Sequence, residues 1–280
     1  YLTQQGILKK SSLDRYSTRF NIDHKATKWL DLGLKATVGY SKTNFADPEA
    51  GAGRQNWGNP WFTTLLAYPY ESPDDWYNVD NPTLITKYYD RETGRLKTVA
   101  SVYAKASITD WLSVKTNFGL DFMYNRNVST LHRDHPNAQQ NHGYYGQTSS
   151  ELFRYTWTNT INVNKDFANG HSLNALAGME MFQGKWYTSN FTGYDLNSDM
   201  MQSPAGIGDK SGSSLFPPSI GGGRTMSNLM SFFAQASYSI ANKYNFSASL
   251  RHDTSSKFYE DNASATFWSV GASWLISSES

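Results

Sequence analysis

Residues 231–253 carry the pattern that most constrains what this chain can fold into. Apolar side chains occupy every second position in two arms, which are joined by a short turn at 241–243. The apolar positions are Phe232, Ala234, Ala236, Tyr238 and Ile240 in the first arm and Tyr244, Phe246, Ala248 and Leu250 in the second. A period of two is typical of an extended strand, because successive side chains point to opposite faces. Each arm runs roughly a dozen residues, about twice the usual length of a soluble strand. The segment therefore predicts a hairpin long enough to cross a bilayer, which takes about 9–11 tilted residues per strand.

The two faces of this hairpin differ in chemistry. The intervening positions are almost wholly polar, as in Asn245, Ser247 and Ser249. The chain as a whole combines 9 Trp, 18 Tyr and 15 Phe with a mean hydropathy of −0.59. A transmembrane barrel has this combination, since half of each strand faces lipid and the other half faces a wet lumen. No run approaches the roughly 18 apolar residues of a transmembrane helix.

The same alternation recurs along the chain. It predicts further hairpins at 13–45, 98–124 and 152–182 and a ninth strand at 267–275. The connections alternate between short ones, near 25–28, 109–110, 165–171 and 241–243, and long ones, near 46–97, 126–150 and 183–228. Outer-membrane barrels have this asymmetry, with short periplasmic turns and long external loops. We therefore predict an all-β fold: about nine long antiparallel strands of an up-and-down transmembrane β-barrel. Nine strands leave two open edges, so we expect a curved, open sheet whose edges pair with other segments.

Aromatic residues support the membrane interpretation, because two belts of rings are predicted at the ends of the strands. The belt at the short turns comprises Trp29, Trp111, Tyr244 and Trp274, and the belt at the long loops comprises Tyr40, Phe122, Tyr155, Phe232 and Trp268. A soluble β-sandwich or propeller, the main alternative, has no reason to segregate its aromatics in this way.

Two sets of residues are candidates for contact with a ligand. Charged side chains on the polar parity are predicted to face the lumen, and they are Arg15, Arg19, Lys35, Lys105, Lys115, Arg154, Arg251 and Asp253. Aromatic residues predicted in the external loops are Trp57, Trp61, Tyr144, Tyr145, Trp186 and Tyr187. Flat rings with a polar tip suit sugars or peptides. The simpler interpretation remains open for each set, because loop aromatics often pack loops and lumen charges often pair across strands.

The sequence contains no catalytic or metal-binding pattern that we recognise. There is no cysteine, and the net charge of +1 argues against a nucleic-acid partner. His132, His135 and His142 fall in one predicted loop, but no carboxylate spacing fixes a metal geometry. Asp195 and Asp199 lack the glycine and terminal glutamate of a calcium loop. We expect no enzyme activity and no cofactor. The segment 60–67 predicts either a short helix or an apolar patch that packs its loop.

Several longer motifs follow one another in order along nearly the whole chain. The early ones are Arg19-Phe20-Asn21-Ile22-Asp23, Thr27-Lys28-Trp29-Leu30-Asp31-Leu32-Gly33, Asn81-Pro82 and His171-Ser172-Leu173-Asn174-Ala175-Leu176-Ala177-Gly178. The later ones are Ser231-Phe232-Phe233, Tyr238-Ser239-Ile240-Ala241-Asn242-Lys243-Tyr244, Ala248-Ser249-Leu250-Arg251-His252-Asp253-Thr254-Ser255-Ser256-Lys257-Phe258 and Phe267-Trp268-Ser269-Val270-Gly271-Ala272-Ser273-Trp274. Together these motifs resemble those of SusC/RagA-type TonB-linked outer-membrane transporters. The chain departs from the pattern of that family where Gln235 and Ser237 replace Arg and Asn and where Thr254 replaces Gly. These departures predict a less cationic lumen near that hairpin.

The resemblance implies a barrel of about 22 strands in the bacterial outer membrane, in contact with the lipid bilayer and lipopolysaccharide. It also implies an N-terminal plug, a SusD-like lipoprotein lid and energy supplied by the TonB complex. The family imports oligosaccharides or peptides. Residues 1–280 would be part of the barrel domain. The chain begins at Tyr1, and neither plug nor TonB box is in this sequence, so we expect it to be a piece of a longer protein.

Other functions remain open on the sequence alone. The barrel alternatives are a siderophore-type receptor and a structural or adhesive surface barrel. An outer-membrane enzyme is disfavoured because no catalytic constellation is present. The sequence does not choose between glycan and peptide as the substrate.

Overall fold

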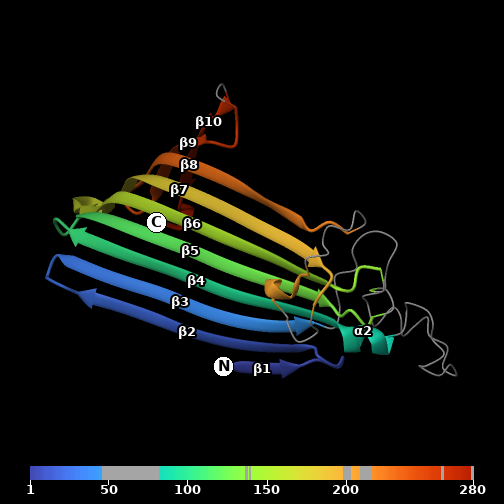
Figure 1. Ribbon diagram of the computed structural model, residues 1–280. Helices are drawn as coiled ribbons and strands as arrows, with labels where there is room; N and C mark the ends of the chain where they lie inside the picture. The colour runs from blue at the N-terminus through green and yellow to red at the C-terminus, as the bar shows by residue number, and fades with distance from the viewer. Residues whose placement is uncertain are drawn as a thin grey trace.

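The structure, a computed structural model, is a single antiparallel sheet. It describes residues 1–45, 82–135, 138, 140–197, 203–208, 216–259 and 262–278. Ten strands follow one another across the sheet in chain order, so that each strand pairs with the one before it and the one after it (Figure 1). The strands are β1 (Leu2–Gln5), β2 (Ser12–Lys25), β3 (Leu30–Phe45), β4 (Tyr89–Ser107), β5 (Leu112–Leu131), β6 (Tyr144–Phe167), β7 (His171–Tyr194), β8 (Ser219–Ile240), β9 (Tyr244–Ser255) and β10 (Ser264–Trp274).

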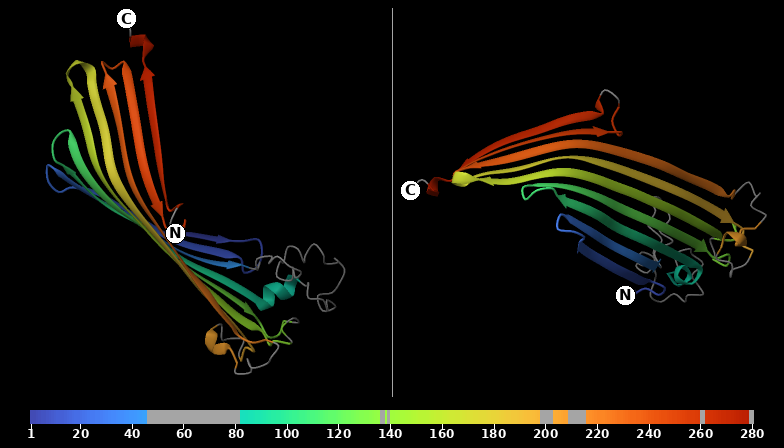
Figure 2. Two further views of the ribbon diagram at one scale, coloured as in Figure 1. Left: turned by 90° about the horizontal axis from the view of Figure 1, so that it is seen from above. Right: turned by 90° about the vertical axis from the view of Figure 1, so that its left-hand side faces the viewer.

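The sheet is open and curved, as predicted. β1 and β10 are its two edges, and no pairing joins them (Figure 2). The predicted nine long strands are all present, whereas β1 was not predicted. β1 has only four residues, too few to display an amphipathic period. It is held by pairing with the outer end of β2, where Leu2 lies opposite Arg15.

The short turns owe their shape to a repeated local structure. In the β2–β3 turn, the Thr27 hydroxyl oxygen accepts hydrogen bonds from the backbone N–H groups of Trp29 (3.3 Å) and Leu30 (3.1 Å). In the β4–β5 turn, the Thr109 hydroxyl oxygen accepts the N–H of Leu112 at 3.1 Å. Such side-chain bonds stabilise a turn because they satisfy backbone donors that the ladder leaves free. The sequence similarity between these two turns therefore reflects one turn geometry used twice.

The strands extend further toward the long connections than the sequence predicted. β5 continues to Leu131, β6 begins at Tyr144, β7 continues to Tyr194 and β8 begins at Ser219. The prediction that Tyr144, Tyr145, Trp186 and Tyr187 lie in loops is therefore wrong, because all four lie on strands. The outer segments are rich in Ser, Thr, Asn and Gly on both parities. A strand that meets water on both faces shows no amphipathic period, so the pattern ends before the pairing does.

The first long connection is also shorter than predicted. The helix α2 (Pro82–Tyr88) leads directly into β4 at Tyr89. Short 3-10 turns occur between β6 and β7 (Ala168–Gly170), within the β7–β8 connection (Pro204–Gly206) and after β10 (Ile276–Ser278). Trp57, Trp61 and the segment 60–67 lie outside the described residues. Within the described part of the chain, no helix is long and apolar enough to cross a membrane.

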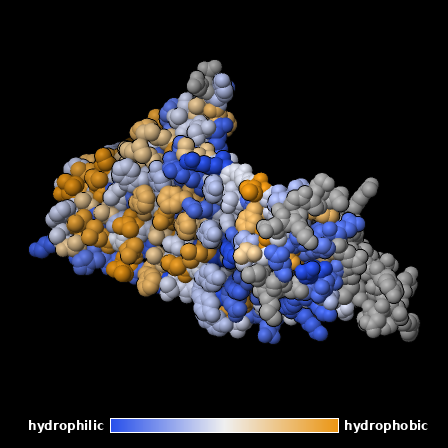
Figure 3. Space-filling model, in the orientation of Figure 1, coloured by the Kyte–Doolittle hydropathy of each residue, from blue (hydrophilic) through white to orange (hydrophobic). Residues whose placement is uncertain are grey.

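One face of the sheet is apolar over the half nearer the short turns. Figure 3 shows orange side chains gathered there and blue ones over the half nearer the long connections. Seven of the nine predicted belt residues share this apolar parity by register: Tyr40, Phe122, Tyr155, Phe232, Tyr244, Trp268 and Trp274. The other two, Trp29 and Trp111, lie within the short turns and are exposed. Tyr244 and Trp274 stack at the short-turn end with ring centroids 6.2 Å apart.

The outer belt is inclined to the rows of directly paired residues, as expected when the strands are tilted in a membrane. The rung of directly paired residues that starts at Tyr40 reaches Arg224 on β8, whereas the belt residue of β8 is Phe232, nearer the short turn. Between β3 and β8 the belt thus shifts about 26 Å along the strands, at about 3.3 Å per residue. Over the same five strand spacings it crosses about 24 Å of sheet, at about 4.8 Å per strand. The ratio corresponds to a tilt of about 45° from the barrel axis, as in transmembrane barrels.

Candidate functional site

The second face of the sheet, here called the polar face, is the candidate site. The register places all eight predicted lumen charges on it: Arg15, Arg19, Lys35, Lys105, Lys115, Arg154, Arg251 and Asp253. They are spread from β2 to β9 and do not form one cluster. Two pairs of them are neighbours: Lys105 and Lys115 are direct cross-strand partners, and Arg251 is hydrogen-bonded to Asp253. The chemistry of the face therefore depends on a few local groupings.

One grouping lies near the short turns, around Tyr103. Its hydroxyl donates a hydrogen bond of 2.8 Å to the Asp23 carboxylate, two strands away. The ring crosses Gly33, where a Cβ atom would lie 1.9 Å from Tyr103 Cε1. The Lys115 ammonium lies 5.1 Å from the ring centroid on the β5 side. Because Gly33 has no side chain, the Tyr103 ring can lie across β3 and contact both the Asp23 carboxylate and the Lys115 ammonium.

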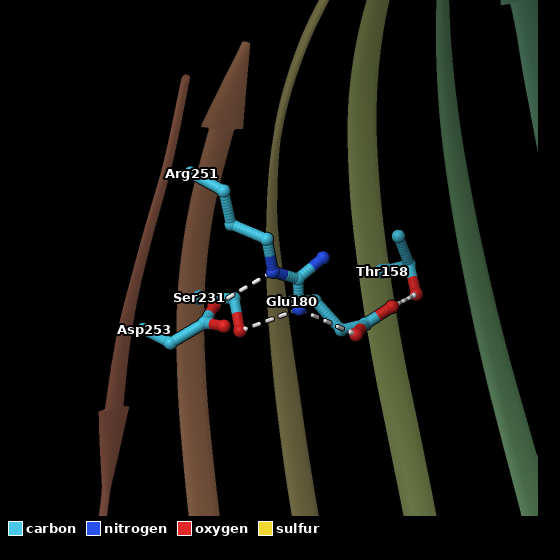
Figure 4. Close-up of polar contacts among 5 residues, drawn as sticks. All are labelled: Thr158, Glu180, Ser231, Arg251 and Asp253. Carbon is cyan, nitrogen blue, oxygen red and sulfur yellow. Dashed lines mark hydrogen bonds and ion pairs between the residues drawn. The ribbon is translucent and has the colours of Figure 1, made fainter. Parts of the chain in front are cut away.

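A second grouping spans four strands, β6 to β9 (Figure 4). The Arg251 guanidinium donates to Asp253 Oδ1 at 2.7 Å and to the Ser231 hydroxyl at 3.0 Å. Its Nη2 atom lies 3.7 Å from Glu180 Oε1, and Thr158 donates to the other Glu180 oxygen at 3.1 Å. We call these five residues the Arg251 network. One cation is thereby shared between two carboxylates, which leaves the grouping with excess negative charge.

Packing against β8 explains why the Arg251 side chain can extend from β9 to Glu180 on β7. Its guanidinium carbon lies 5.6 Å from the centroid of the Phe233 ring, its cross-strand neighbour on β8. Ser231, next along β8 on the same face, is completely buried beneath the guanidinium. A serine at this point is small enough to let the arginine cross β8, and its hydroxyl accepts one of the five donors.

A cleft of about 680 Å³ lies on the polar face in the outer halves of β5 to β8. Its lining includes apolar Met123, Leu152 and Trp186 and the cations Arg154 and Lys257, and it is completed by Asn125, Ser150, Gly184, Thr225, Met226 and Ser227. A third cationic residue, Lys185, also borders it, but the register places the Lys185 side chain on the opposite face of the sheet from Arg154 and Trp186. We call it the outer cleft. Its volume falls in the range of small-molecule sites, about 300–1,000 Å³. No carboxylate belongs to this lining.

The outer ends of the strands are covered by their own connections. Tyr145, Ala138 and Leu196 are buried there, and Leu196 forms a bridge with Ile207. His142 Nδ1 lies 3.0 Å from Asp195 Oδ1, linking the β5–β6 connection to the β7–β8 connection. Burial lowers the pKa of His135, which is only 4% exposed, because the protein cannot solvate its charged form. We call these folded connections the outer cap, whose described residues are 132–135, 138, 140–143, 195–197 and 203–208.

The predicted ligand-contacting aromatics do not act together. Trp186 lies on the polar face in the outer cleft and is 51% exposed. Tyr187 follows it and is exposed on the opposite face. Tyr145 is completely buried and stacks on Phe191 with centroids 6.0 Å apart. Tyr144 lies between Tyr89 and Tyr194, and burial raises the pKa of its hydroxyl. Of these four residues, only Trp186 presents its ring to the cleft.

Sequence analysis did not identify most of the residues that surround these groups. Met123, Leu152 and Lys257 line the outer cleft, and Ser231 and Thr158 complete the Arg251 network. Their polar-face parity was readable from the strand alternation. Their convergence was not, because the inter-strand register decides which residues of four strands meet.

The described residues contain no grouping of three or more His, Asp or Glu side chains arranged to hold a metal. His132 and His135 lie against Tyr88, with ring centroids 5.3 Å and 6.3 Å from its ring. Asp195 accepts from the Gly208 N–H and pairs with His142. Asp199 lies outside the described residues. His132 and His135 thus contact the end of α2, and His142 contacts the β7–β8 connection.

Comparison with known proteins places this sheet in a family. Residues 39–279 match the family model "TonB dependent receptor-like, beta-barrel". TonB-dependent receptors P39 and P26 of Formosa agariphila are 23% and 24% identical to the chain over 281 and 294 residues. These alignments cover all of this chain but only 26% and 28% of the two relatives. The chain thus spans about a quarter of the length of the curated relatives it matches.

Solved structures give the same fold. The RagAB peptide transporter superposes with a TM-score of 0.78 at 19% identity, over 96% of this chain and 31% of that one. BauA, the ferric preacinetobactin receptor from Acinetobacter baumannii, superposes with a TM-score of 0.52 at 11% identity, over 96% and 38%. The predicted TonB-linked barrel family is confirmed, and the fold is more similar to that of RagAB than to that of BauA. The chain therefore belongs to the TonB-dependent receptor-like β-barrel family.

Proposed function

We propose that residues 1–280 form part of the transmembrane barrel domain of an active importer in the bacterial outer membrane. The importer would take up oligosaccharides or peptides with energy delivered by the TonB complex. The observation that carries this proposal is the family match over residues 39–279, in a sheet with one apolar and one polar face. Lipid and lipopolysaccharide would contact the apolar face and its outer rim, and the polar face would line the lumen.

The remaining parts of the machine would lie elsewhere in the protein. The open edges at β1 and β10 would pair with further strands of a barrel of about 22 strands, and a plug domain would fill the lumen. The length of the curated relatives, about four times that of this chain, supports this division. Displacement of the plug would open a path along the polar face, past the outer cleft and then the Arg251 network.

A surface lipoprotein of the SusD type is the proposed partner. It would close over the outer ends of the strands and trap substrate against the external loops. The SusC/RagA-type motifs in the sequence support this partner, as does the fold similarity to a structure described as the RagAB peptide transporter. That description favours peptides, whereas the motifs suit either substrate class, so both belong to the proposal.

Uptake by cells that express the full-length protein tests the import function. Labelled oligosaccharides and labelled peptides of about five units would be supplied separately, with and without a protonophore. TonB-coupled import predicts accumulation that is abolished by the protonophore and by deletion of tonB. Diffusion through an open pore would continue in both cases and would contradict the proposal. Surface retention without accumulation would instead support a structural or adhesive barrel, and uptake restricted to ferric chelates would support a siderophore receptor.

A further inference from the structure

We propose that the outer cleft binds the carboxylate of an anionic ligand and places the adjoining apolar or ring portion of that ligand against Trp186. This inference rests on the proposed import function, because it specifies the charge of the substrate that the barrel would take up. It concerns a particular place on the polar face and a particular chemistry. Neither the family match nor the fold similarity assigns it.

The first observation is the charge of the cleft. Arg154 and Lys257 both line it, and no Asp or Glu does. Neither the guanidinium of Arg154 nor the ammonium of Lys257 has an ion pair or a hydrogen bond to any part of the chain that the structure describes. Two like charges that share a concave surface raise each other's energy, and a bound anion relieves this cost.

The second observation concerns the acid nearest to Arg154. Asp121 is its direct cross-strand neighbour on β5. The structure nevertheless shows no ion pair between them, Asp121 does not line the cleft, and its buried Oδ1 atom has no hydrogen-bond partner in the described residues. Arg154 is exposed instead. Its fork of N–H donors is thus free to bind a ligand carboxylate in a bidentate manner.

The third observation is how Lys257 is held. Lys257 lies in the connection from β9 to β10, directly after Ser256, which is hydrogen-bonded to Asn228 of β8. The Ser256 N–H donates to the Asn228 carbonyl at 3.0 Å, and the Asn228 N–H donates to the Ser256 hydroxyl at 2.8 Å. The Lys257 N–H itself donates to the Ser255 hydroxyl at 3.3 Å. These bonds fix the backbone of the lysine at the rim of the cleft, so binding of a ligand costs little backbone entropy there.

The fourth observation is the apolar floor. Trp186 is 51% exposed on the polar face, with Leu152 as its cross-strand partner on β6 and Thr225 as its partner on β8. Met123 and Leu152, direct cross-strand partners, extend the apolar surface beside it. A half-exposed tryptophan leaves apolar area in water that a ligand would cover, at about 25 cal/mol per Å². A sugar ring or an apolar side chain presents a suitable surface.

Two other concavities show that this arrangement is not general. A cleft of about 860 Å³ lies between residues 5–12 and the outer ends of β3 to β5, and unlike the outer cleft it is lined by two acids, Asp90 and Glu92, each of which is already paired with a lysine. Lys10 lies 2.7 Å from Asp90, and Lys42 lies 2.8 Å from Glu92. A third cleft, of about 480 Å³, is lined by residues of β6 to β10 with no charged side chain among them. Free cations beside an exposed ring occur together in the outer cleft.

A carboxylate next to a ring or an apolar group occurs in two sources that fit the proposed substrates. One is an oligosaccharide of uronic acids, and the other is a peptide with an acidic side chain. The test therefore has two arms, each with a matched neutral probe. Trigalacturonate is compared with trigalactose, and the end-blocked peptide Gly-Phe-Glu-Phe-Gly with Gly-Phe-Gln-Phe-Gly.

Binding is measured by calorimetry and by tryptophan fluorescence on the full-length protein in detergent micelles. In at least one arm we expect the anionic probe to bind about tenfold more tightly than its neutral counterpart at low salt. The double variant Arg154→Gln/Lys257→Gln should lose this preference, and Trp186→Ala should weaken both probes of that arm. Arg19→Gln is the matched control, because it removes a cation of the polar face that lies on β2 and contacts Thr37. Heat-resistant migration of each variant verifies that the barrel is folded.

The absence of a charge preference in both arms, including the absence of binding, would overturn the inference. A preference that persists in the double variant would do the same. These results are separable from failure of the proposed function. Protonophore-sensitive uptake of neutral probes alone would leave import standing and remove the anion site. Charge-selective binding without energised uptake would leave the anion site standing and remove import.

Discussion

The Arg251 guanidinium lies 3.7 Å from the Glu180 carboxylate, although β8 separates the strands that carry the two residues. The contact is made over a buried serine, and Asp253 holds the guanidinium from the other side. Three strands are thus tied by side chains as well as by their ladders. On a membrane barrel such ties lie on the wet face, where the solvent is water and not lipid.

This relationship predicts an asymmetric response to mutation. Arg251→Gln leaves two carboxylates without their shared cation, and we expect a loss of about 1–2 kcal/mol of refolding stability in lipid, since the groups are partly exposed. Glu180→Gln removes one acid and should cost less than about 1 kcal/mol. The measurement is urea-dependent refolding of the full-length protein in liposomes at low and high salt. If Glu180→Gln costs as much as Arg251→Gln, the cation is not shared in the way described.

The assignment of the two faces predicts opposite tolerances at adjacent positions. Ala248 lies opposite Val270 on the apolar face, whereas the Ser249 hydroxyl lies 2.7 Å from that of Ser269 on the polar face. Ala248→Arg should cost about 2–4 kcal/mol, the price of a charge at a lipid-facing midplane site. Ser249→Arg should cost less than about 1 kcal/mol, because its charge stays hydrated. The same refolding assay compares them. Equal costs would contradict a lipid-facing sheet, and a larger cost at Ser249 would reverse the two faces.

Gly33 and Tyr103 form a steric pair that a double-mutant cycle can test. A methyl group at Gly33 would overlap the Tyr103 ring, so Gly33→Ala must displace the ring and break its bond to Asp23. We expect a cost of about 1–3 kcal/mol, as for overpacking elsewhere. In a Tyr103→Ala background the same change should cost less than about half of that. An unchanged cost in the two backgrounds would show that the ring does not occupy the space above Gly33. Gly39→Ala, where only the Tyr16 carbonyl oxygen lies within reach at 3.7 Å, is the control.

The outer cap should loosen on acidification. Burial lowers the pKa of His135 below its ordinary value of 6.5, so the unfolded cap binds a proton more readily than the folded cap. The contribution of this residue to stability is complete above pH 6.5 and is lost as the pH falls through the lowered pKa. The protection of the amides of residues 132–135 and 140–143 against hydrogen exchange, expressed relative to the intrinsic exchange rate at each pH, should therefore be lower below about pH 6 than at pH 8.

His135→Phe provides the control for this pH dependence. A neutral ring of similar shape keeps the contact with Tyr88, whose centroid lies 6.3 Å away, and removes the titrating group. We expect exchange in this variant to differ less between pH 8 and pH 6 after correction for the intrinsic rates. An unchanged difference would show that His135 is not the source of the effect.

The sequence alone determined the parts of the fold that depend on two solvents. Lipid on one side and water on the other impose a strict alternation, so the parity of Ala248 and Ser249 was readable before any pairing was known. The short turns were readable for a related reason, because Thr27 and Thr109 repeat one local hydrogen-bonding pattern. Both signals are local, and each needs only a few neighbouring residues.

Only the tertiary structure determined how far the strands extend outside the membrane and which side chains meet across strands. Above the membrane both faces contact water, the alternation disappears, and Tyr145 and Trp186 were assigned to loops although they lie on strands. The two residues differ in exposure, since the folded connections bury Tyr145 whereas Trp186 is exposed in the outer cleft. Arg154 and Lys257 are far apart in sequence and line one surface because the strand register and the β9–β10 connection bring them there. Such convergence is a property of several strands at once, and no single strand records it.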